Sequence, residues 1–330
     1  MRLNTPRAAL VGTIAVTALA LAGCSASTPA ADENAGLSIV ASTNVYGSIA
    51  EAIGGDLVTV TSIITSAAQD PHSYEASAQD QLALSKADLV IENGGGYDPF
   101  IDTLLSASSS EAPVVNASEA SGLLEGDAHE HDDDASTSST DSAAEEEEGH
   151  EGHDHIEGFN EHVWYSFHGV EHVAEEIAHQ LSELDADNAA TYEANFTAFT
   201  GEIEALEARA EALHADTEGM GAAITEPVPL YLLEAAGFTN RTPEEFSEAI
   251  EEGTDVAPAV LAQTLALFGS GSVSLLAYNS QTASNETEEV RAAAEENGVA
   301  VVEFTETMPD GADYVSWMTD NLSAISAAVK

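Results

Sequence analysis

Two short phrases of the sequence each carry a histidine in a setting suited to binding a metal ion. They are residues 70–75, which read DPHSYE, and residues 160–165, which read NEHVWY. Imidazole nitrogens together with carboxylates are the donors that a borderline divalent cation such as zinc or manganese needs. The two phrases therefore indicate one precise metal site, with His72 and His162 as its candidate nitrogen ligands.

Between the phrases lies a tract, residues 124–157, that is crowded with histidine, aspartate and glutamate. Its histidines are His129, His131, His150, His153 and His155. Such segments bind metals weakly and at several places, because several ligand geometries have nearly equal energy. We expect a disordered loop whose histidines collect metal beside the precise site. The alternative is an insertion that only keeps the protein soluble.

The chain begins with the features of an export signal. Two arginines precede an apolar run, residues 8–21, which is too short for a membrane span and ends in the sequence LAGC at 21–24. This ending resembles the lipobox of bacterial lipoproteins, in which cleavage leaves the cysteine as the lipidated first residue. We expect residues 1–23 to be a lipoprotein signal peptide, Cys24 to carry the lipid and residues 24–36 to form a flexible tether.

Cysteine count and charge restrict what the exported part can be. Cys24 is the only cysteine, so disulfides cannot stabilise the domain and its core must do so alone. The chain has 59 acidic residues and only 7 lysines and arginines. Acidity of this degree argues against a nucleic-acid partner, because phosphate binding needs basic surfaces. It also raises the concentration of cations near the protein.

Hydrophobic periodicity predicts the elements that must position the two histidines. In the first half, we expect strands at 38–42, 57–65, 88–92 and around 114–115, with helices at 45–53, at 79–86 and from 99 onward. In the second half, we expect strands at 221–225, 272–278 and 300–304, with helices at 230–236, 258–268, 286–296 and 314–329. Strands that alternate with helices imply crossover connections and mainly parallel sheets.

Two helical stretches, residues 168–184 and 188–215, separate the halves. The second would span about 40 Å at 1.5 Å per residue, long enough to join two lobes. We therefore expect an α/β fold of two lobes, each with a mainly parallel sheet flanked by helices, joined by this long helix. The expected divisions are an N-terminal lobe at 37–123 that ends in 158–187, the inserted loop at 124–157, the linking helix at 188–215 and a C-terminal lobe at 216–330.

Two carboxylates of the second half lie where such a fold would place ligands. Open α/β sheets bind ligands at the carboxyl ends of their strands. Glu226 directly follows the strand predicted to end at Thr225, and Glu306 follows the strand predicted at 300–304. His72 lies in the loop after the strand at 57–65. The four side chains are therefore expected to converge on the cleft between the lobes, with His162 entering from the end of the insertion.

In these motifs the chain resembles the metal-binding solute receptors of ABC importers, in the cluster that captures zinc or manganese. Besides the two histidine phrases, the resemblance rests on residues 41–46 (ASTNVY), 87–90 (ADLV), 93–100 (NGGGYDPF), 225–227 (TEP), 278–279 (YN) and 304–306 (FTE). It covers the chain after the tether. It implies a monomeric receptor, anchored by lipid to the outer face of the cytoplasmic membrane, that delivers a divalent metal ion to an ABC permease and its ATPase.

The resemblance also implies which side chains bind the ion: His72, His162, Glu226 and Glu306. Many members have aspartate at the fourth position, and Asn279 and Glu303 are its rivals, although a strand's period of two places residues 303 and 306 on opposite faces. A site of two histidines and two carboxylates suits Zn²⁺ or Mn²⁺. The histidine-rich tract favours zinc, with manganese as the alternative.

Two other classes of function use similar parts. An exported metallohydrolase would need an open metal position and a general base, but no His-Glu-x-x-His or serine-centred phrase is present. We therefore expect no enzyme. A surface adhesin or metal chaperone would use the same lipoprotein scaffold and stays open at this stage. His168 and His172, four residues apart on a predicted helix, are interpreted as a surface pair or as groups that support the ligands from outside.

Overall fold

The computed structural model describes residues 36–126, 156 and 158–330. The predicted lipidation site Cys24, the tether before residue 36 and the histidines His129, His131, His150, His153 and His155 lie outside these residues. Within the described ranges, every helix is too short or too polar to cross a bilayer.

The first sheet consists of four short parallel strands. They are β1 (Leu37–Thr43), β2 (Val58–Ile64), β3 (Leu89–Glu92) and β4 (Val114–Asn116), and their order across the sheet is β2-β1-β3-β4. Every residue of β3 is buried, as expected for an inner strand that is covered on both faces. The sequence places apolar, often β-branched residues here because both sides of the strand must avoid water.

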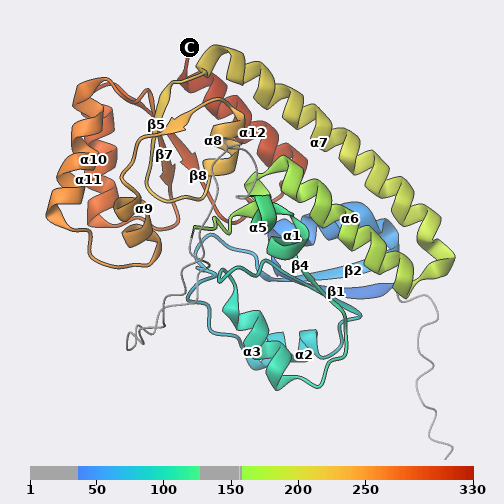
Figure 1. The fold of residues 1–330 in the computed structure, drawn as a ribbon. Coiled ribbons are helices and arrows are strands. Elements are labelled where there is room, and N and C mark those ends of the chain that lie inside the picture. Colours follow the sequence, from blue (N-terminus) through green and yellow to red (C-terminus); the bar gives the residue numbers. More distant parts are fainter. Residues whose placement is uncertain (1–35, 127–155, 157) are drawn as a thin grey trace, which may run out of the picture. The chain divides into compact units, whose positions relative to one another are not determined.

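Helices cover both faces of this sheet (Figure 1). The helices of the lobe are α1 (Asn44–Gly54), α2 (Ala78–Leu84), α3 (Pro99–Ala107), α4 (Ala117–Ala120), α5 (Leu123–Gly126) and α6 (Phe167–Leu184). One face packs against α2 and α3 in a cluster that includes Val40, Leu84 and Phe100. The other face packs against α1 and α6 in a larger cluster that includes Ile39, Ile49 and Val173.

The second sheet repeats this order. Its strands are β5 (Gly221–Ile224), β6 (Thr239–Asn240), β7 (Leu275–Asn279) and β8 (Ala300–Phe304), all parallel, in the order β6-β5-β7-β8. The helices are α8 (Leu230–Ala235), α9 (Glu244–Glu251), α10 (Pro258–Ser270), α11 (Asn285–Glu296) and α12 (Tyr314–Ala328). One core cluster joins Phe246 of α9, Phe268 of α10 and Leu276 of β7.

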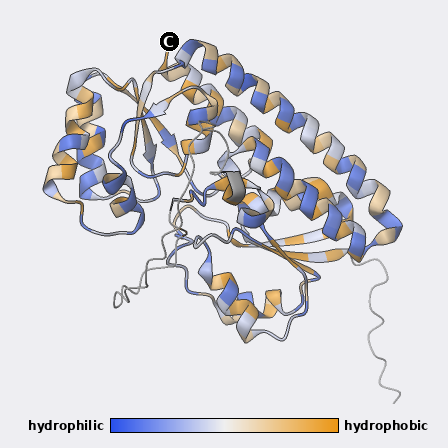
Figure 2. Ribbon diagram, viewed as in Figure 1, coloured by the Kyte–Doolittle hydropathy of each residue, from blue (hydrophilic) through white to orange (hydrophobic). Residues whose placement is uncertain are grey.

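One long helix and one apolar cluster connect the two lobes. Helix α7 (Ala189–Thr217) has 29 residues and contacts α1 and α6 of the first lobe and α12 and α8 of the second. Apolar and hydrophilic residues are mixed along the length of both α6 and α7 (Figure 2). The larger core cluster continues from Ile91 of β3 through Trp164 and Tyr165 to Ile224 of β5. The lobes therefore share one hydrophobic core.

The predicted fold class is confirmed: there are two α/β lobes with parallel sheets, and a long helix joins them. The boundaries differ in places. The strand predicted to begin at residue 272 begins at Leu275, because Gly271 ends α10 in a left-handed conformation with φ 72° and residues 272–274 complete the turn. The sequence analysis missed α9, whose run of glutamates resembles a solvated loop although Phe246 and Ile250 are buried.

Candidate metal site

His72 lies in the segment that follows β2, at the carboxyl end of the strand. Its backbone N–H donates to Asp70 Oδ1 at 3.0 Å, and its ring Nδ1 lies 3.2 Å from the same oxygen. Because a carboxylate only accepts, we assign a proton to Nδ1. The other ring nitrogen, Nε2, lies 3.5 Å from Glu161 Oε1 and is the atom that we predict to bind a metal ion.

His162 is held in the same way. It directly precedes the 3₁₀ turn Val163–Tyr165, and its Nδ1 lies 2.7 Å from Asn160 Oδ1. Asn160 in turn donates through Nδ2 to the carbonyl oxygen of Pro227 at 3.1 Å, while the Tyr231 hydroxyl donates to the Asn160 carbonyl at 2.9 Å. One asparagine thus orients the histidine and ties its segment to the chain just beyond Glu226.

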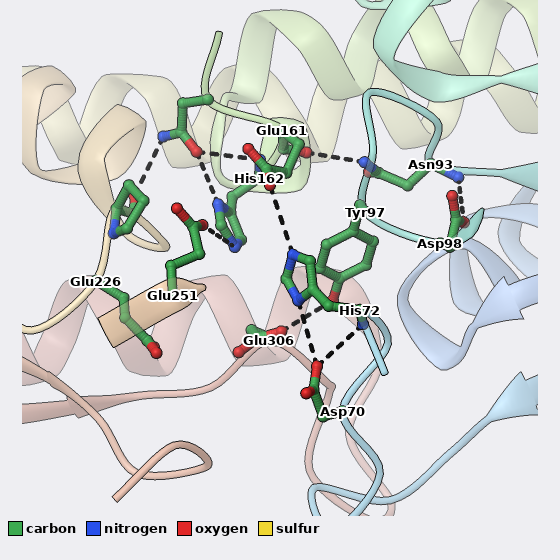
Figure 3. A network of polar contacts seen from close by, with 12 residues as sticks. Asp70, His72, Asn93, Tyr97, Asp98, Glu161, His162, Glu226, Glu251 and Glu306 are labelled. Atoms are coloured by element: carbon green, nitrogen blue, oxygen red, sulfur yellow. Dashed lines mark hydrogen bonds and ion pairs between the residues drawn. The ribbon is translucent and has the colours of Figure 1, made fainter. Parts of the chain in front are cut away.

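A glycine loop after β3 brings an aromatic ring next to both histidines. Buried Asp98 accepts the backbone N–H groups of Asn93 at 2.6 Å and Gly94 at 2.8 Å, which closes the turn. Gly94 has φ 70°, and a Cβ there would lie 2.2 Å from Asn116 Nδ2, so this position requires glycine. The turn directs Tyr97 into the site (Figure 3).

Tyr97 joins the two lobes across the site. The centroid of its ring lies 4.9 Å from that of His72 and 5.7 Å from that of His162. Its hydroxyl donates to Glu306 Oε2 at 3.3 Å. The ring therefore limits the volume around both histidines and, through its hydroxyl, orients a carboxylate of the other lobe.

Glu226 and Glu306 follow β5 and β8, as the sequence predicted, and both are buried. The side-chain amide of Asn279, at the end of β7, donates to Glu226 Oε2 and to Glu306 Oε1, the latter at 2.8 Å. Glu226 Oε1 is buried and has no hydrogen-bond partner among the described residues. Asn279 thus holds two carboxylates side by side and leaves an oxygen of Glu226 to bind a ligand.

The structure brings the predicted ligands to one region, though not into one tight group. Donor atoms of Asp70, His72 and Glu306 all lie within 4.8 Å of one another. The ring centroids of His72 and His162 are 6.4 Å apart. Glu226 joins the region through Asn279 rather than by direct contact with a histidine. Which of these side chains bind the ion therefore stays a prediction.

The two rivals for the fourth position lie differently. Asn279 is inside the site, but its Nδ2 donates to both carboxylates. The Glu303 side chain is 55% exposed and pairs with Arg291 Nη2 at 3.2 Å, on the opposite face of β8 from Glu306. This placement follows the alternation of side chains along a strand.

Two further carboxylates, which were not predicted from the sequence, reach the site. Glu161 Oε1 faces His72, and Glu251 Oε1, at the end of α9, lies 3.7 Å from His162 Nε2. Donor atoms of His72, Glu161 and Glu251 all lie within 4.8 Å of one another (Figure 3). The position of Glu161 next to His162, a predicted ligand, could have suggested it. Nothing in the sequence marks Glu251, because its place depends on the missed helix.

Crowding and burial shift the acidities of these groups. Burial, reinforced by the charge of Glu306, raises the pKa of Glu226 to about 8. Burial, reinforced by Glu161, raises the pKa of Glu251 to about 9. Burial alone would lower the pKa of His72, but the hydrogen bonds with Asp70 and Glu161 outweigh it and raise the pKa well above its usual value. The metal-free site therefore holds protons that a divalent cation would replace.

His168 and His172 lie outside this site, on α6. Their Nε2 atoms are 3.3 Å apart, and His172 Nδ1 lies 3.8 Å from Glu175 Oε2 on the same helix. His168 is exposed and the His172 side chain is 42% exposed. The pair is on the surface, as the sequence analysis interpreted it.

Comparison with known proteins gives a family. Residues 39–328 match the profile of the family described as zinc-uptake complex component A, periplasmic. The chain belongs to this family. Membership agrees with the predicted resemblance to metal receptors of importers, and it speaks against the metallohydrolase alternative, because the family is one of uptake components rather than enzymes.

Curated relatives of this chain are named for different metals. The manganese-binding lipoprotein MntA of Halalkalibacterium halodurans is 30% identical over 198 residues, which are 59% of this chain and 55% of the relative. The iron ABC transporter substrate-binding lipoprotein MtsA of Streptococcus pyogenes serotype M1 is 24% identical over 263 residues, 73% of this chain and 76% of the relative. The MntA match spans little more than half of that relative's length.

Solved structures show the same fold. ZnuA superposes with a TM-score of 0.66 at 23% identity, covering 89% of this chain and 100% of that chain. FpvC of Pseudomonas aeruginosa, solved in complex with Mn²⁺, gives a TM-score of 0.67 at 23% identity, covering 89% of this chain and 98% of that chain. At this identity the likeness establishes the fold of the family, and the choice of metal must be argued from the site.

Proposed function

We propose that this protein is an extracytoplasmic receptor that captures a divalent transition-metal ion, zinc in the first place, and delivers it to an ABC permease. One observation carries the proposal: His72 and His162 each have Nδ1 held by an oxygen acceptor and Nε2 turned toward buried carboxylates. This is how proteins orient histidines that bind metals through the second nitrogen.

The proposed ligands are His72 and His162 from the first lobe and Glu226 and Glu306 from the second. Two carboxylates neutralise a divalent cation, and four protein ligands can surround it completely. A closed coordination sphere suits a receptor that must release its ion unchanged, whereas a catalytic metal needs an open position. Because the ligands come from both lobes, a small separation of the lobes would remove some of them and lower the affinity.

The extent of this separation is limited by the shared core. Residues of both sheets belong to one apolar cluster, and α7 contacts both lobes. A large hydrophobic interface opposes wide domain motion. We therefore propose a hinge of small amplitude. Structures of the metal-free and metal-bound protein would test it, and a lobe rotation of tens of degrees would rule the idea out.

Zinc is the preferred cargo because histidines are abundant in the tract at 124–157, which we propose as an accessory collector. Manganese is the second candidate, and a specific observation favours it. Glu161 and Glu251 add oxygen donors beside the histidines, and manganese accepts more oxygen ligands than zinc does. The curated relatives named for manganese agree with this candidate.

The remaining parts of the proposal concern location and partners. We propose that Cys24 carries a lipid that anchors a monomeric receptor to the outer face of the cytoplasmic membrane, where it meets the permease and its ATPase. The curated lipoproteins of metal ABC transporters support this arrangement. Labelling of the expressed protein with a radioactive fatty acid, compared with a Cys24→Ser variant, tests the anchor.

A competition titration tests the cargo. The affinity and stoichiometry for Zn²⁺ and Mn²⁺ would be measured on the mature protein with and without residues 124–157. One tight zinc ion that survives deletion of the tract, together with loss of additional weak sites, would support a zinc receptor with an accessory collector. Poor zinc binding by the shortened protein, or a larger thermal stabilisation by manganese, would replace zinc with manganese.

A further inference from the structure

The last residue of α9 enters the metal site from the second lobe. Glu251 follows Ile250, which anchors the end of the helix in the core together with Phe246. This anchoring aims the carboxylate at His162, and the Glu251 side chain is only 12% exposed. On the basis of the proposed function, we propose that Glu251 is a further ligand of the cargo ion and lets the site accept an oxygen-rich, six-coordinate ion such as Mn²⁺.

The distances suit donors that share one ion. Two donor atoms at about 2.1 Å from a metal lie about 3.0 Å apart at a right angle and about 4.2 Å apart when opposite. Glu251 Oε1 lies 3.7 Å from His162 Nε2, and its donor atom lies within 4.8 Å of those of His72 and Glu161. A separation of 3.7 Å is too long for a hydrogen bond, so a hydrogen bond does not explain the pairing.

The polar surroundings of Glu251 give an independent reason. Its Oε1 is buried and has no hydrogen-bond partner among the described residues, and such an oxygen is costly unless something binds it. The carboxylate also stands at the C-terminal end of a helix, where the helix dipole is negative. The groups facing it from other elements are three more carboxylates, Glu161, Glu226 and Glu306, and the imidazoles of His72 and His162. The carboxylates outnumber the imidazoles around Glu251, so a bound cation would stabilise this position.

The consequence concerns metal selectivity. With His72, His162, Glu226 and Glu306, the site has the four donors that zinc needs. Additional oxygens from Glu251 and Glu161 raise the number of donors toward six, which manganese prefers and zinc does not require. Removal of the Glu251 carboxylate should therefore weaken manganese binding much more than zinc binding.

The test uses the full mature protein and the variant Glu251→Gln, which keeps the shape of the side chain but replaces the charged donor with an amide. The matched control is Glu252→Gln, which removes the same charge from the neighbouring exposed residue. Dissociation constants for Mn²⁺ and Zn²⁺ would be measured by chelator competition. We expect Glu251→Gln to weaken manganese binding by at least about 10-fold and zinc binding by less than about 3-fold, with no change in the control.

Several outcomes would overturn the inference. These are unchanged manganese binding in Glu251→Gln, an equal loss for both metals, or an equal loss in Glu252→Gln, since the last two would reflect general charge. If the glutamine variant does not fold, Glu251→Asp replaces it, because it keeps the charge and withdraws the donor by one methylene. The same selective loss is expected there. Wild-type protein that binds neither metal would overturn the proposed function itself, whereas tight wild-type binding with an insensitive variant overturns only the role of Glu251.

Discussion

The two lobes contribute to the site in different ways. The first lobe supplies histidines whose rings are already oriented, His72 by Asp70 and His162 by Asn160. The second lobe supplies carboxylates that crowd one another, with Glu226 and Glu306 sharing the amide of Asn279. The first lobe thus provides oriented rings, with Asp70 and Glu161 beside them, and the second provides buried carboxylates whose charge is costly.

This difference assigns separate tasks to the lobes. A preoriented histidine loses little freedom when it binds a metal, so the first lobe should dominate affinity. The crowded carboxylates hold protons that they must release when a cation binds, so the second lobe should dominate the dependence on charge, on pH and on the kind of ion.

Replacement of a histidine of the first lobe should be the most damaging change. We expect His162→Ala to weaken zinc binding by more than about 100-fold, because it removes a donor that is already positioned and buried. Chelator competition measures this, and the exposed His179→Ala on α6 is the control. Near-normal affinity in His162→Ala would place the ion elsewhere.

Replacement of a carboxylate of the second lobe should have a smaller effect. We expect Glu306→Gln to weaken binding by about 10-fold to 100-fold, since Asn279 and Tyr97 can still hold the side chain in place. Glu303→Gln is the matched control on the same strand, and its side chain faces Arg291 instead of the site. Isothermal titration would measure the metal affinity of both variants. If Glu303→Gln lost more affinity than Glu306→Gln, the assignment of Glu306 as the fourth ligand would be wrong.

Loss of Asn160, which orients the His162 ring, should weaken metal binding by about 10-fold. Asn160→Ala removes the acceptor at His162 Nδ1 and the link to the Pro227 carbonyl, so the ring can rotate and the segment is less tightly tied to the second lobe. Metal affinity and the melting temperature of the metal-free protein would be measured together. A loss of stability without a loss of affinity would mean that Asn160 only joins the lobes.

The metal-free protein should lose stability as the pH rises from about 5.5 to about 8. The folded-state pKa of Glu226 is raised from 4.5 to about 8, so in this range the folded state holds a proton that the unfolded chain has released. The raised pKa of His72 acts in the same direction, because its contribution is lost as the pH rises through the folded-state value. Calorimetry in the presence of chelator should show a melting temperature that is several degrees lower at about pH 8 than at about pH 5.5. Each kcal/mol lost from the free energy of unfolding lowers it by about 2–4 °C.

Two comparisons sharpen the pH prediction. In Glu226→Gln the dependence should become shallower, because one of the titrating groups is gone. In the presence of saturating zinc the trend should reverse, since the ion competes with protons and binds more tightly at higher pH. A metal-free protein that is more stable at about pH 8 than at about pH 5.5 would contradict the picture of a crowded, proton-holding second lobe.

The surface pair on α6 should have the smallest effect. We expect the double variant His168→Ala/His172→Ala to keep the tight affinity of wild type within about 2-fold, because the pair is exposed and does not contact the proposed ligands. A competition titration at low metal concentration measures it. A large loss would show that the site extends beyond the region between the sheets.

Much of this arrangement was predictable from sequence because it depends on local signals. Alternating strands and helices predicted both parallel sheets, and an unbroken helical period predicted α7. The phrases around His72 and the strand ends before Glu226 and Glu306 placed these side chains at the carboxyl edges. Glu251 was not predicted as a site residue, because its position depends on α9. The sequence of this short helix is mostly charged, and its two buried apolar residues do not stand out.

Other features required the three-dimensional structure. The contact of Tyr97 with Glu306 joins residues 209 positions apart, and that of Asn279 with Glu226 joins residues 53 positions apart. No local period predicts such pairings, because the first arises where the two lobes meet and the second from the pairing of β5 with β7 within the second lobe. The raised pKa values depend on the same packing, since burial is their largest cause.

The apolar cluster that runs through both sheets has a consequence for folding. Trp164 and Tyr165 lie in the middle of this cluster, so separation of the lobes would expose a large part of the core of each. The lobes should accordingly melt as one cooperative unit in spite of their separate sheets. The binding energy of a single ion would then protect the whole polypeptide, and a chain whose one cysteine permits no internal disulfide would resist proteolysis best when it holds a bound ion.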